Sequence, residues 1–107
     1  MARPGELWLA AIPYTSGAAS KLRPVLILWE DAADVVVSTV STAPPRSATD
    51  VSLKDWQSEG LRAPSTVRLL RLDCLERLVR RRQLGRLTLA DAQRLQAIWA
   101  DKVQLRF

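Results

Sequence analysis

The chain has 107 residues, of which 48% are hydrophobic and 25% charged, and its formal net charge is +5. A chain of this length forms one domain around a small hydrophobic core, so we expect a single domain over residues 1–107. The sequence contains no histidine and one cysteine. This excludes Ser/His/Asp hydrolysis, Cys/His proteolysis, histidine-based ribonuclease chemistry, an internal disulfide and a cysteine metal site. We expect neither a metal ion nor a cofactor.

The sequence has no segment typical of a membrane protein. No apolar run approaches the about 20 residues that a membrane span needs, and the N-terminus lacks a charged and apolar leader. We therefore expect a cytoplasmic protein without a membrane partner. The single cysteine, Cys74, is expected to be a buried thiol, because free cysteine behaves as a small apolar side chain.

The positive charge is concentrated in one region. The segment Leu61 to Arg86 carries eight arginines against Asp73 and Glu76, a local charge of +6, which leaves about −1 for the rest of the chain. Arginine forms bidentate contacts with phosphate and carboxylate groups. The pattern favours nucleic acid or an acidic protein as partner.

Most of the chain is predicted to be extended. Residues Gly5 to Ile12 are apolar at successive positions, which favours a strand buried on both faces in a closed sheet and ended by Pro13. Later segments rich in valine, isoleucine and threonine are separated by polar or proline-containing turns. They predict strands at Val25–Trp29, Val35–Thr42, Thr49–Leu53 and Ser65–Leu70, with a turn of helix around Asp55-Trp56-Gln57.

The entry to the second predicted strand, Lys21 to Leu28, combines cations with an apolar run. Pro24 has no N–H and disfavours helix in the residue before it, so Arg23 should be extended at the first position of the strand. The preceding residues 14–20 have short side chains and several hydroxyl groups. Such a loop allows close approach by a polyanion.

The arginine-rich segment gives conflicting signals. Its apolar residues recur at helical spacing, which by itself favours an amphipathic helix, whereas the neighbouring predicted strands favour an extended segment. Gly85 ends this segment, and Thr88 with Asp91 three residues later is typical of a helix start. We predict a C-terminal helix up to about Lys102, with one apolar face formed by Ala92, Leu95, Ile98, Trp99 and Val103.

The four tryptophans have different surroundings in the sequence. Trp8, Trp29 and Trp99 lie within apolar runs and are expected in the core or in a dimer interface. Trp56 lies between Asp55 and Gln57, and its place is left open.

Several short motifs occur in an order that resembles the MazF/PemK-like toxins of type II toxin–antitoxin systems, and they extend over nearly the whole chain. They are Gly5-Glu6-Leu7-Trp8, Ser20 to Leu28, Ser41-Thr42, Asp55-Trp56-Gln57, Pro64 to Leu69, and Leu84-Gly85-Arg86-Leu87. The resemblance implies a β-dominated α+β fold, an SH3-like curved β-barrel with a short connecting helix and a C-terminal amphipathic helix. On this basis we predict extended structure from Ser65 to about Leu78, against the helical periodicity.

The resemblance also implies a function. Members of this family are homodimeric toxins that inhibit growth by sequence-specific, metal-independent cleavage of single-stranded RNA (mRNA), and an antitoxin neutralises them. We expect the antitoxin to carry an acidic tail. The family's catalytic arginine at the start of the second strand and threonine near the end of the third match Arg23 and Ser41. Expected substrate-binding residues are Thr15, Ser16, Ser20, Lys21 and Thr42.

The chemistry of these residues fits RNA cleavage. Attack of a ribose 2′-hydroxyl on the adjacent phosphate needs stabilisation of the phosphorane charge, which Arg23 can supply while Ser41 donates to a non-bridging oxygen. Arg23 can also protonate the leaving 5′-oxygen. Without the family, Arg23 would be an ordinary cation at a strand end and Ser41 one of several strand hydroxyls.

The sequence departs from the family at two places. Serine replaces threonine at Ser41, and Ala18, Ala19 and Ser20 occupy a loop in which many members carry an acidic or glutamine residue, so the general base is unassigned. The alternative function is a non-catalytic module of the same barrel fold that binds nucleic acid or protein. Residues Arg80–Arg82 are expected to form a solvated face or an antitoxin-binding edge.

Overall fold

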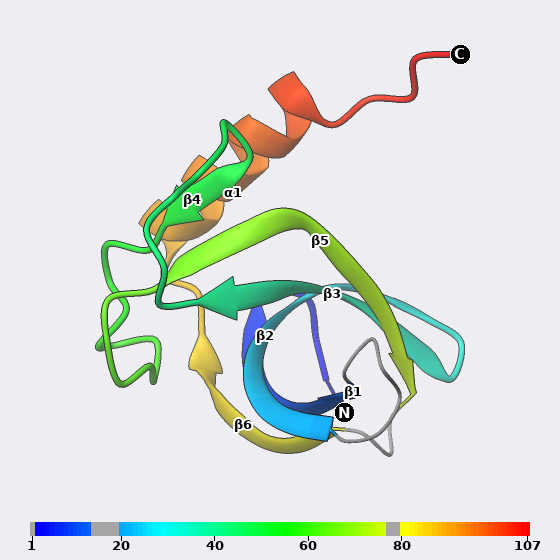
Figure 1. The fold of residues 1–107 in the computed structure, drawn as a ribbon, viewed down its shortest axis with the longest axis vertical. Coiled ribbons are helices and arrows are strands. Elements are labelled where there is room, and N and C mark those ends of the chain that lie inside the picture. The colour runs from blue at the N-terminus through cyan, green and yellow to red at the C-terminus, as the bar shows by residue number, and fades with distance from the viewer. Residues whose placement is uncertain (1, 14–19, 77–79) are drawn as a thin grey trace.

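The computed structural model of the protein describes residues 2–13, 20–76 and 80–107, and in these ranges all side chains except those of Pro13, Ser20, Arg80 and Arg81. This part of the chain forms a six-stranded antiparallel sheet and one helix (Figure 1). The elements in chain order are β1 (Glu6–Pro13), β2 (Ser20–Asp31), β3 (Asp34–Ser41), β4 (Asp50–Ser52), β5 (Thr66–Glu76), β6 (Arg80–Arg86) and α1 (Leu89–Lys102).

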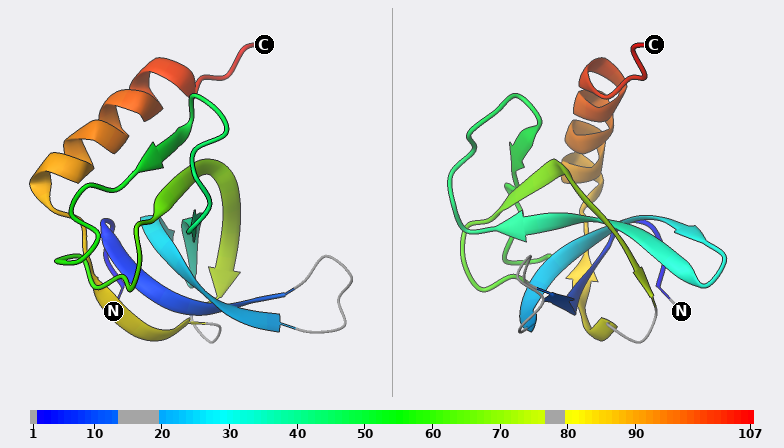
Figure 2. Two further views of the ribbon diagram at one scale, coloured as in Figure 1. Left: turned by 60° about the vertical axis from the view of Figure 1, so that its left-hand side comes forward. Right: turned by 45° about the vertical axis from the view of Figure 1, so that its right-hand side comes forward.

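The strands are ordered β4-β5-β3-β2-β1-β6, and the sheet is strongly curved (Figures 1 and 2). The β-dominated α+β class is confirmed. The expected closure of the barrel is not observed in the described residues, because β4 and β6 are the two edges and do not pair with each other. A turn occupies part of the outer edge of β6: a Cβ added to Gly60 would overlap the carbonyl group of Leu84.

Strand β5 decides between the two interpretations of the arginine-rich segment. Leu72 to Glu76 pair with β3, so the helical interpretation is wrong for these residues. The prediction of an extended segment is confirmed up to Glu76, and the end of that predicted segment, residues 77 and 78, lies outside the described residues. The register jumps from Ser38↔Leu72 to Thr39↔Arg68, so β5 contains three additional residues at this point. Such a bulge bends the strand (Figure 1) and interrupts the two-residue alternation, which explains the misleading helical periodicity.

Helix α1 begins as predicted. Thr88 is the N-cap in an extended conformation, and its hydroxyl oxygen accepts a hydrogen bond of 3.3 Å from the Asp91 N–H. The expected turn of helix around Asp55-Trp56-Gln57 is present as a single turn, in which the Glu59 N–H donates to the Asp55 carbonyl four residues earlier at 3.1 Å, and it does not extend into a longer helix. Gly60 has a φ of +90°, which an α-helix cannot continue.

The core is divided between the two faces of the sheet. The cluster on the face that α1 covers contains Leu7, Leu26, Val40, Val51, Leu53, Leu61, Val67, Leu69 and Leu95. The cluster on the other face contains Ala2, Ala10, Val25, Ile27, Val35, Val37 and Leu75. Because side chains alternate along a strand, residues 23, 25 and 27 of β2 belong to this second face.

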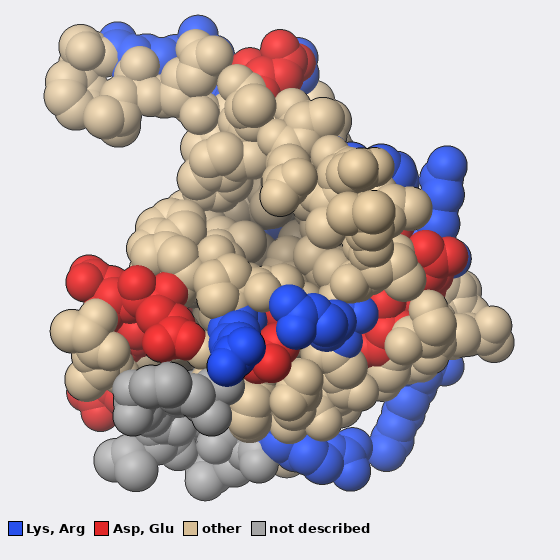
Figure 3. Space-filling view, turned by 180° about the vertical axis from the view of Figure 1, so that it is seen from behind, with Lys and Arg blue, Asp and Glu red and all other residues tan. Residues whose placement is uncertain are grey.

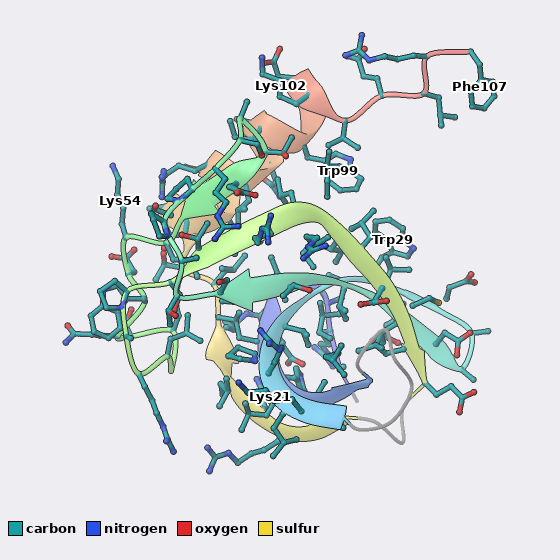
Figure 4. The ribbon with its side chains drawn as sticks, in the orientation of Figure 1. Lys21, Trp29, Lys54, Trp99, Lys102 and Phe107 are labelled. Carbon is teal, nitrogen blue, oxygen red and sulfur yellow. The ribbon has the colours of Figure 1, made fainter. Side chains whose placement is uncertain are left out.

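Several expectations about single residues need correction. Cys74 is exposed rather than buried, because the half of β5 beyond the bulge is exposed except for Leu75. Trp8 and Trp99 are partly buried and pack against the two clusters. Trp29 is 42% exposed, and its ring meets that of Trp99 edge to face at 6.0 Å between centroids (Figure 4). No helix in the described ranges has the length and apolar character to cross a membrane.

Candidate active site

The predicted catalytic pair lies at one end of two neighbouring strands. In β2, Arg23 is opposite Ala10 of β1 and is half-buried. Pairing between β2 and β3 ends at Val25↔Thr39, next to Pro24, which has no N–H to donate. Arg23 lies two residues before Val25 in β2, and Ser41 lies two residues after Thr39 in β3. If the pairing of Val25 with Thr39 is extended by two residues, Arg23 comes opposite Ser41, on the face of the sheet that carries Val25. The fold therefore brings the ends of strands carrying these two residues together.

Ser41 ends β3 and is half-buried. Its hydroxyl oxygen accepts a hydrogen bond of 3.0 Å from the N–H of Ala43, so the turn after the strand fixes the position of the hydroxyl group. An oxygen that accepts this bond can still donate its own proton to a ligand. Thr42 follows outside the strand and is exposed.

The other predicted binding residues are only partly described. Lys21, labelled in Figure 4, is exposed and pairs with Ile12 two positions before Arg23, and the alternation of side chains along a strand sets both cations on one face of β2. Ser20 begins β2, but its side chain is not described, and Thr15 and Ser16 lie outside the described residues. The structure thus collects Lys21, Arg23, Ser41 and Thr42 near one end of the β2 and β3 strands.

A second arginine, which the sequence analysis did not select, lies on the same face. Arg68 of β5 is opposite Thr39 of β3 and opposite Asp50 of β4, so it continues the sheet row that starts at Val25. Directly opposed residues of neighbouring strands share a face. This row is two residues from the row of Arg23 and Ser41, which places a further guanidinium group beside the candidate site.

The guanidinium group of Arg68 lies against Asp50 of β4. Its Nε lies 3.7 Å from Asp50 Oδ1, a long ion-pair contact, and this nitrogen is buried without a hydrogen-bond partner. The signal that could have found Arg68 is its position between the apolar Val67 and Leu69, which are buried on the other face of the strand predicted at Ser65–Leu70.

Charge is more dispersed in space than in the sequence. The +6 segment supplies both β5 and β6, which are separated in the sheet by β3, β2 and β1. On the face seen in Figure 3, Lys and Arg side chains form separate groups with Asp and Glu between them. Among the residues that the structure describes, no group of three or more His, Cys, Asp or Glu side chains could hold a metal ion.

An apolar groove lies on the opposite face, between α1 and the sheet. It has a volume of about 550 Å³ and is lined mainly by β2 residues 26–29 and by α1, with Arg86 as its charged residue. Since Arg23 lies on the face that α1 does not cover, the groove and the candidate active site are separate surfaces.

Solved structures with the same fold include an endoribonuclease bound to its antitoxin, a toxin and a MazE–MazF structure. A mycobacterial endoribonuclease in complex with its cognate antitoxin is 20% identical, with a TM-score of 0.79 over 100% of this chain and 99% of that one. The Mycobacterium tuberculosis toxin MazF-mt6 is 23% identical, with a TM-score of 0.74 over 95% and 99% of the two chains. A MazE–MazF structure from Deinococcus radiodurans is 17% identical, with a TM-score of 0.68 over 98% and 97%.

The sequence comparison identifies the family. No curated protein matches the chain. The family model described as "PemK-like, MazF-like toxin of type II toxin-antitoxin system" matches residues 3–100, which include every element from β1 to most of α1. The chain therefore belongs to the PemK-like, MazF-like toxins of type II toxin–antitoxin systems.

Proposed function

We propose that this protein is an endoribonuclease toxin that cleaves single-stranded RNA, including mRNA, in the cytoplasm without a metal ion. The observation that carries the proposal is the β2–β3 register, whose last pair is Val25↔Thr39: Arg23 and Ser41 lie two residues beyond it on their strands, and Arg68 lies opposite Thr39. Two guanidinium groups and a hydroxyl group on one face suit a phosphate in its transition state. Family membership and the structural similarity to mycobacterial endoribonucleases support the same activity.

The proposed reaction uses the 2′-hydroxyl of the RNA as nucleophile, and the proton that this hydroxyl loses passes to solvent water, since no side chain of the site is assigned as general base. Arg23 stabilises the charge on the phosphorane and protonates the leaving 5′-oxygen, and Ser41 donates to a non-bridging oxygen. Arg68 contributes a second positive charge beside them. Lys21 and Thr42, with Thr15, Ser16 and Ser20, hold the flanking phosphates of the substrate.

We also propose that the toxin is a homodimer and that an antitoxin with an acidic tail neutralises it. The toxin structures from mycobacteria and Deinococcus that share this fold include complexes with antitoxins. The exposed arginines of β5 and β6, together with exposed apolar side chains such as Leu70 and Leu72, suit a partner segment that is both acidic and amphipathic.

Replacing Arg23 tests the proposed activity. Arg23→Ala should abolish cleavage of single-stranded RNA, and Arg23→Lys should restore little of it, because an ammonium group lacks the planar fork. Binding should weaken less than cleavage, since other cations share the backbone charge. The measurement is mapping of RNA ends after incubation in a chelator, where we expect products with a 5′-hydroxyl.

Arg106→Ala is the matched control, because it removes the same charge from an exposed residue near the C-terminal end of the described chain. Circular dichroism of both variants should show an intact fold. Undiminished cleavage by folded Arg23→Ala would remove the proposed site. Absence of cleavage by the wild type across varied RNAs would favour the alternative, a non-catalytic binding module of the same fold.

A further inference from the structure

A carboxylate lies beside the proposed active site, although none of the residues proposed to act on RNA is acidic. Asp50 is the first residue of β4 and lies opposite Arg68 of β5. Thr66, two residues before Arg68, lies opposite Ser41 of β3. Directly opposed residues share a face of the sheet, and so do residues two positions apart on one strand. Asp50 therefore shares a face with both Arg68 and Ser41.

The place of the Arg68 charge depends on what holds its side chain. One residue of a strand spans about 3.3 Å, so Arg68 begins about 7 Å along β5 from the residue opposite Ser41. Arginine carries its charge at the end of a long stem with many rotamers. A guanidinium group that starts at this point acts on a phosphate at Ser41 only if another group fixes its direction.

Asp50 is the group that meets Arg68. The Asp50 side chain is 6% exposed, against 27% for that of Arg68, although β4 is an edge strand. Asp50 Oδ1 lies 3.7 Å from Arg68 Nε, which has no hydrogen-bond partner among the described residues. The contact is an ion pair without a hydrogen bond, and it acts through charge. Of the two side chains, the arginine is the one that reaches the surface.

The second oxygen of Asp50 fixes the turn between β3 and β4. Its Oδ2 accepts a hydrogen bond of 2.9 Å from the Arg46 N–H, and the Asp50 N–H donates to the Ser47 carbonyl at 3.1 Å. At the other end of this turn, the Ala43 N–H donates to the hydroxyl oxygen of Ser41. Asp50 thus closes the turn whose first bond fixes the proposed hydroxyl donor.

We propose that Asp50 is a positioning residue of the proposed active site: its carboxylate holds the Arg68 guanidinium group and the turn after β3, so that Arg68 meets an RNA phosphate beside Ser41. This inference rests on the proposed function. A carboxylate on a face that binds RNA repels the polyanion. Asp50 is almost covered and its charge faces Arg68, so it acts on the substrate through the arginine.

Asp50→Asn separates the two contacts of this side chain. The amide oxygen can still accept from the Arg46 N–H, whereas the neutral amide no longer pairs with the guanidinium group. We expect kcat on single-stranded RNA to fall about tenfold, because a misplaced charge stabilises the transition state less. KM should stay constant or fall, since loss of a negative charge does not weaken RNA binding. The urea midpoint checks that the variant is folded.

The Arg68→Ala background decides whether Asp50 acts through Arg68. Arg68→Ala should itself lower kcat about tenfold or more, and adding Asp50→Asn should then lower kcat no further. Equal losses from Asp50→Asn in both backgrounds would show that Asp50 acts on the fold, and would overturn the proposal. A wild-type kcat in Arg68→Ala would overturn it as well.

Asp101→Asn is the matched control. It also removes a carboxylate from an ion pair, because Asp101 Oδ2 lies 3.4 Å from Lys102 Nζ, but this pair is exposed at the C-terminal end of α1. Asp101→Asn should leave kcat unchanged in both backgrounds.

A measurement on the free protein separates this proposal from the proposed function. Asp50→Asn should accelerate exchange of the Arg68 Nε proton with water about tenfold, measured by NMR, and Asp101→Asn should not. Unchanged exchange in Asp50→Asn would overturn the positioning role even if the wild type cleaves RNA. Accelerated exchange together with a wild type that cleaves no RNA would support the hold on Arg68 and count against the proposed function.

Discussion

At the residue scale, Ser41 and Thr42 offer two hydroxyl groups to the same substrate. Ser41 is the last residue of β3 and its oxygen is fixed by the Ala43 N–H, whereas Thr42 is exposed beyond the strand. A preorganised donor stabilises a transition state better than one that must be ordered during the reaction. We therefore expect Ser41 rather than Thr42 to act on the phosphorane.

Three substitutions test this assignment. Ser41→Ala should lower kcat on RNA by about 10²-fold, Ser41→Thr should be tolerated because it keeps the hydroxyl, and Thr42→Ala should have little effect. Single-turnover cleavage rates provide the measurement. If Ser41→Ala alone is mild and the Ser41→Ala, Thr42→Ala double variant is severe, Thr42 replaces its neighbour. A loss confined to Thr42→Ala would reverse the assignment.

At the element scale, backbone contacts position the turn at residues 54–60. Gly60 and Gly85 lie where the turn crosses β6, and each approaches the other segment too closely for a side chain. Gly5 also has a φ of +90°, but a Cβ there would find its nearest neighbour, Arg86 Nη2, at 4.0 Å. Gly5 and Gly60 thus have the same φ but different surroundings.

Alanine substitutions separate the cost of a positive φ from the cost of a clash between the new side chain and the neighbouring segment. Gly5→Ala should destabilise the protein by about 1–2 kcal/mol, because only the left-handed backbone is strained. Gly60→Ala should lose about 3 kcal/mol or more, because the clash with Leu84 adds to the same strain. Gly85→Ala tests the clash alone, because a Cβ there would overlap the Glu59 carbonyl group while Gly85 has no positive φ. Equal urea midpoints for Gly5→Ala and Gly60→Ala would show that the close contact does not constrain the turn.

At the scale of the whole molecule, the fold separates charges that are contiguous in the sequence. The arginines of β5 and β6 belong to strands on different sides of the sheet order, and the edge strand β6 carries Arg80, Arg81, Arg82 and Arg86. An acidic partner therefore meets a distributed positive field rather than one patch. Such a field accelerates encounter more than it strengthens the final complex.

The proposed antitoxin complex gives a test of this field. Raising the salt concentration should slow association of the homodimer with an acidic amphipathic antitoxin segment by about tenfold or more, and should change dissociation less. Stopped-flow association and dissociation rates measure both effects, and light scattering measures the dimer. A monomer at micromolar concentration that is indifferent to acidic peptides would contradict both parts of the proposal.

The sequence by itself determined much of the fold. Apolar residues and turn residues located β1, β3 and β4 closely and the inner part of β2, which begins at Ser20 rather than Val25, and Thr88 with Asp91 located the start of α1. These features depend on neighbours in the chain: side-chain alternation along a strand and capping of a helix are local effects. The strand predicted at Ser65–Leu70 became the first part of β5, and the resemblance to the toxin family selected extended structure for the residues after it.

Only the tertiary structure decided the remaining features. The bulge in β5 depends on the register with β3, which no local pattern contains, and it produced the helical spacing that suggested a helix. Arg68 became a candidate for the site because Thr39 and Asp50 lie on either side of it in the sheet. The raised pKa of Glu59 likewise depends on burial first and then on Asp91, 32 positions later in the chain, because only folding buries the carboxyl group and brings the second charge near it.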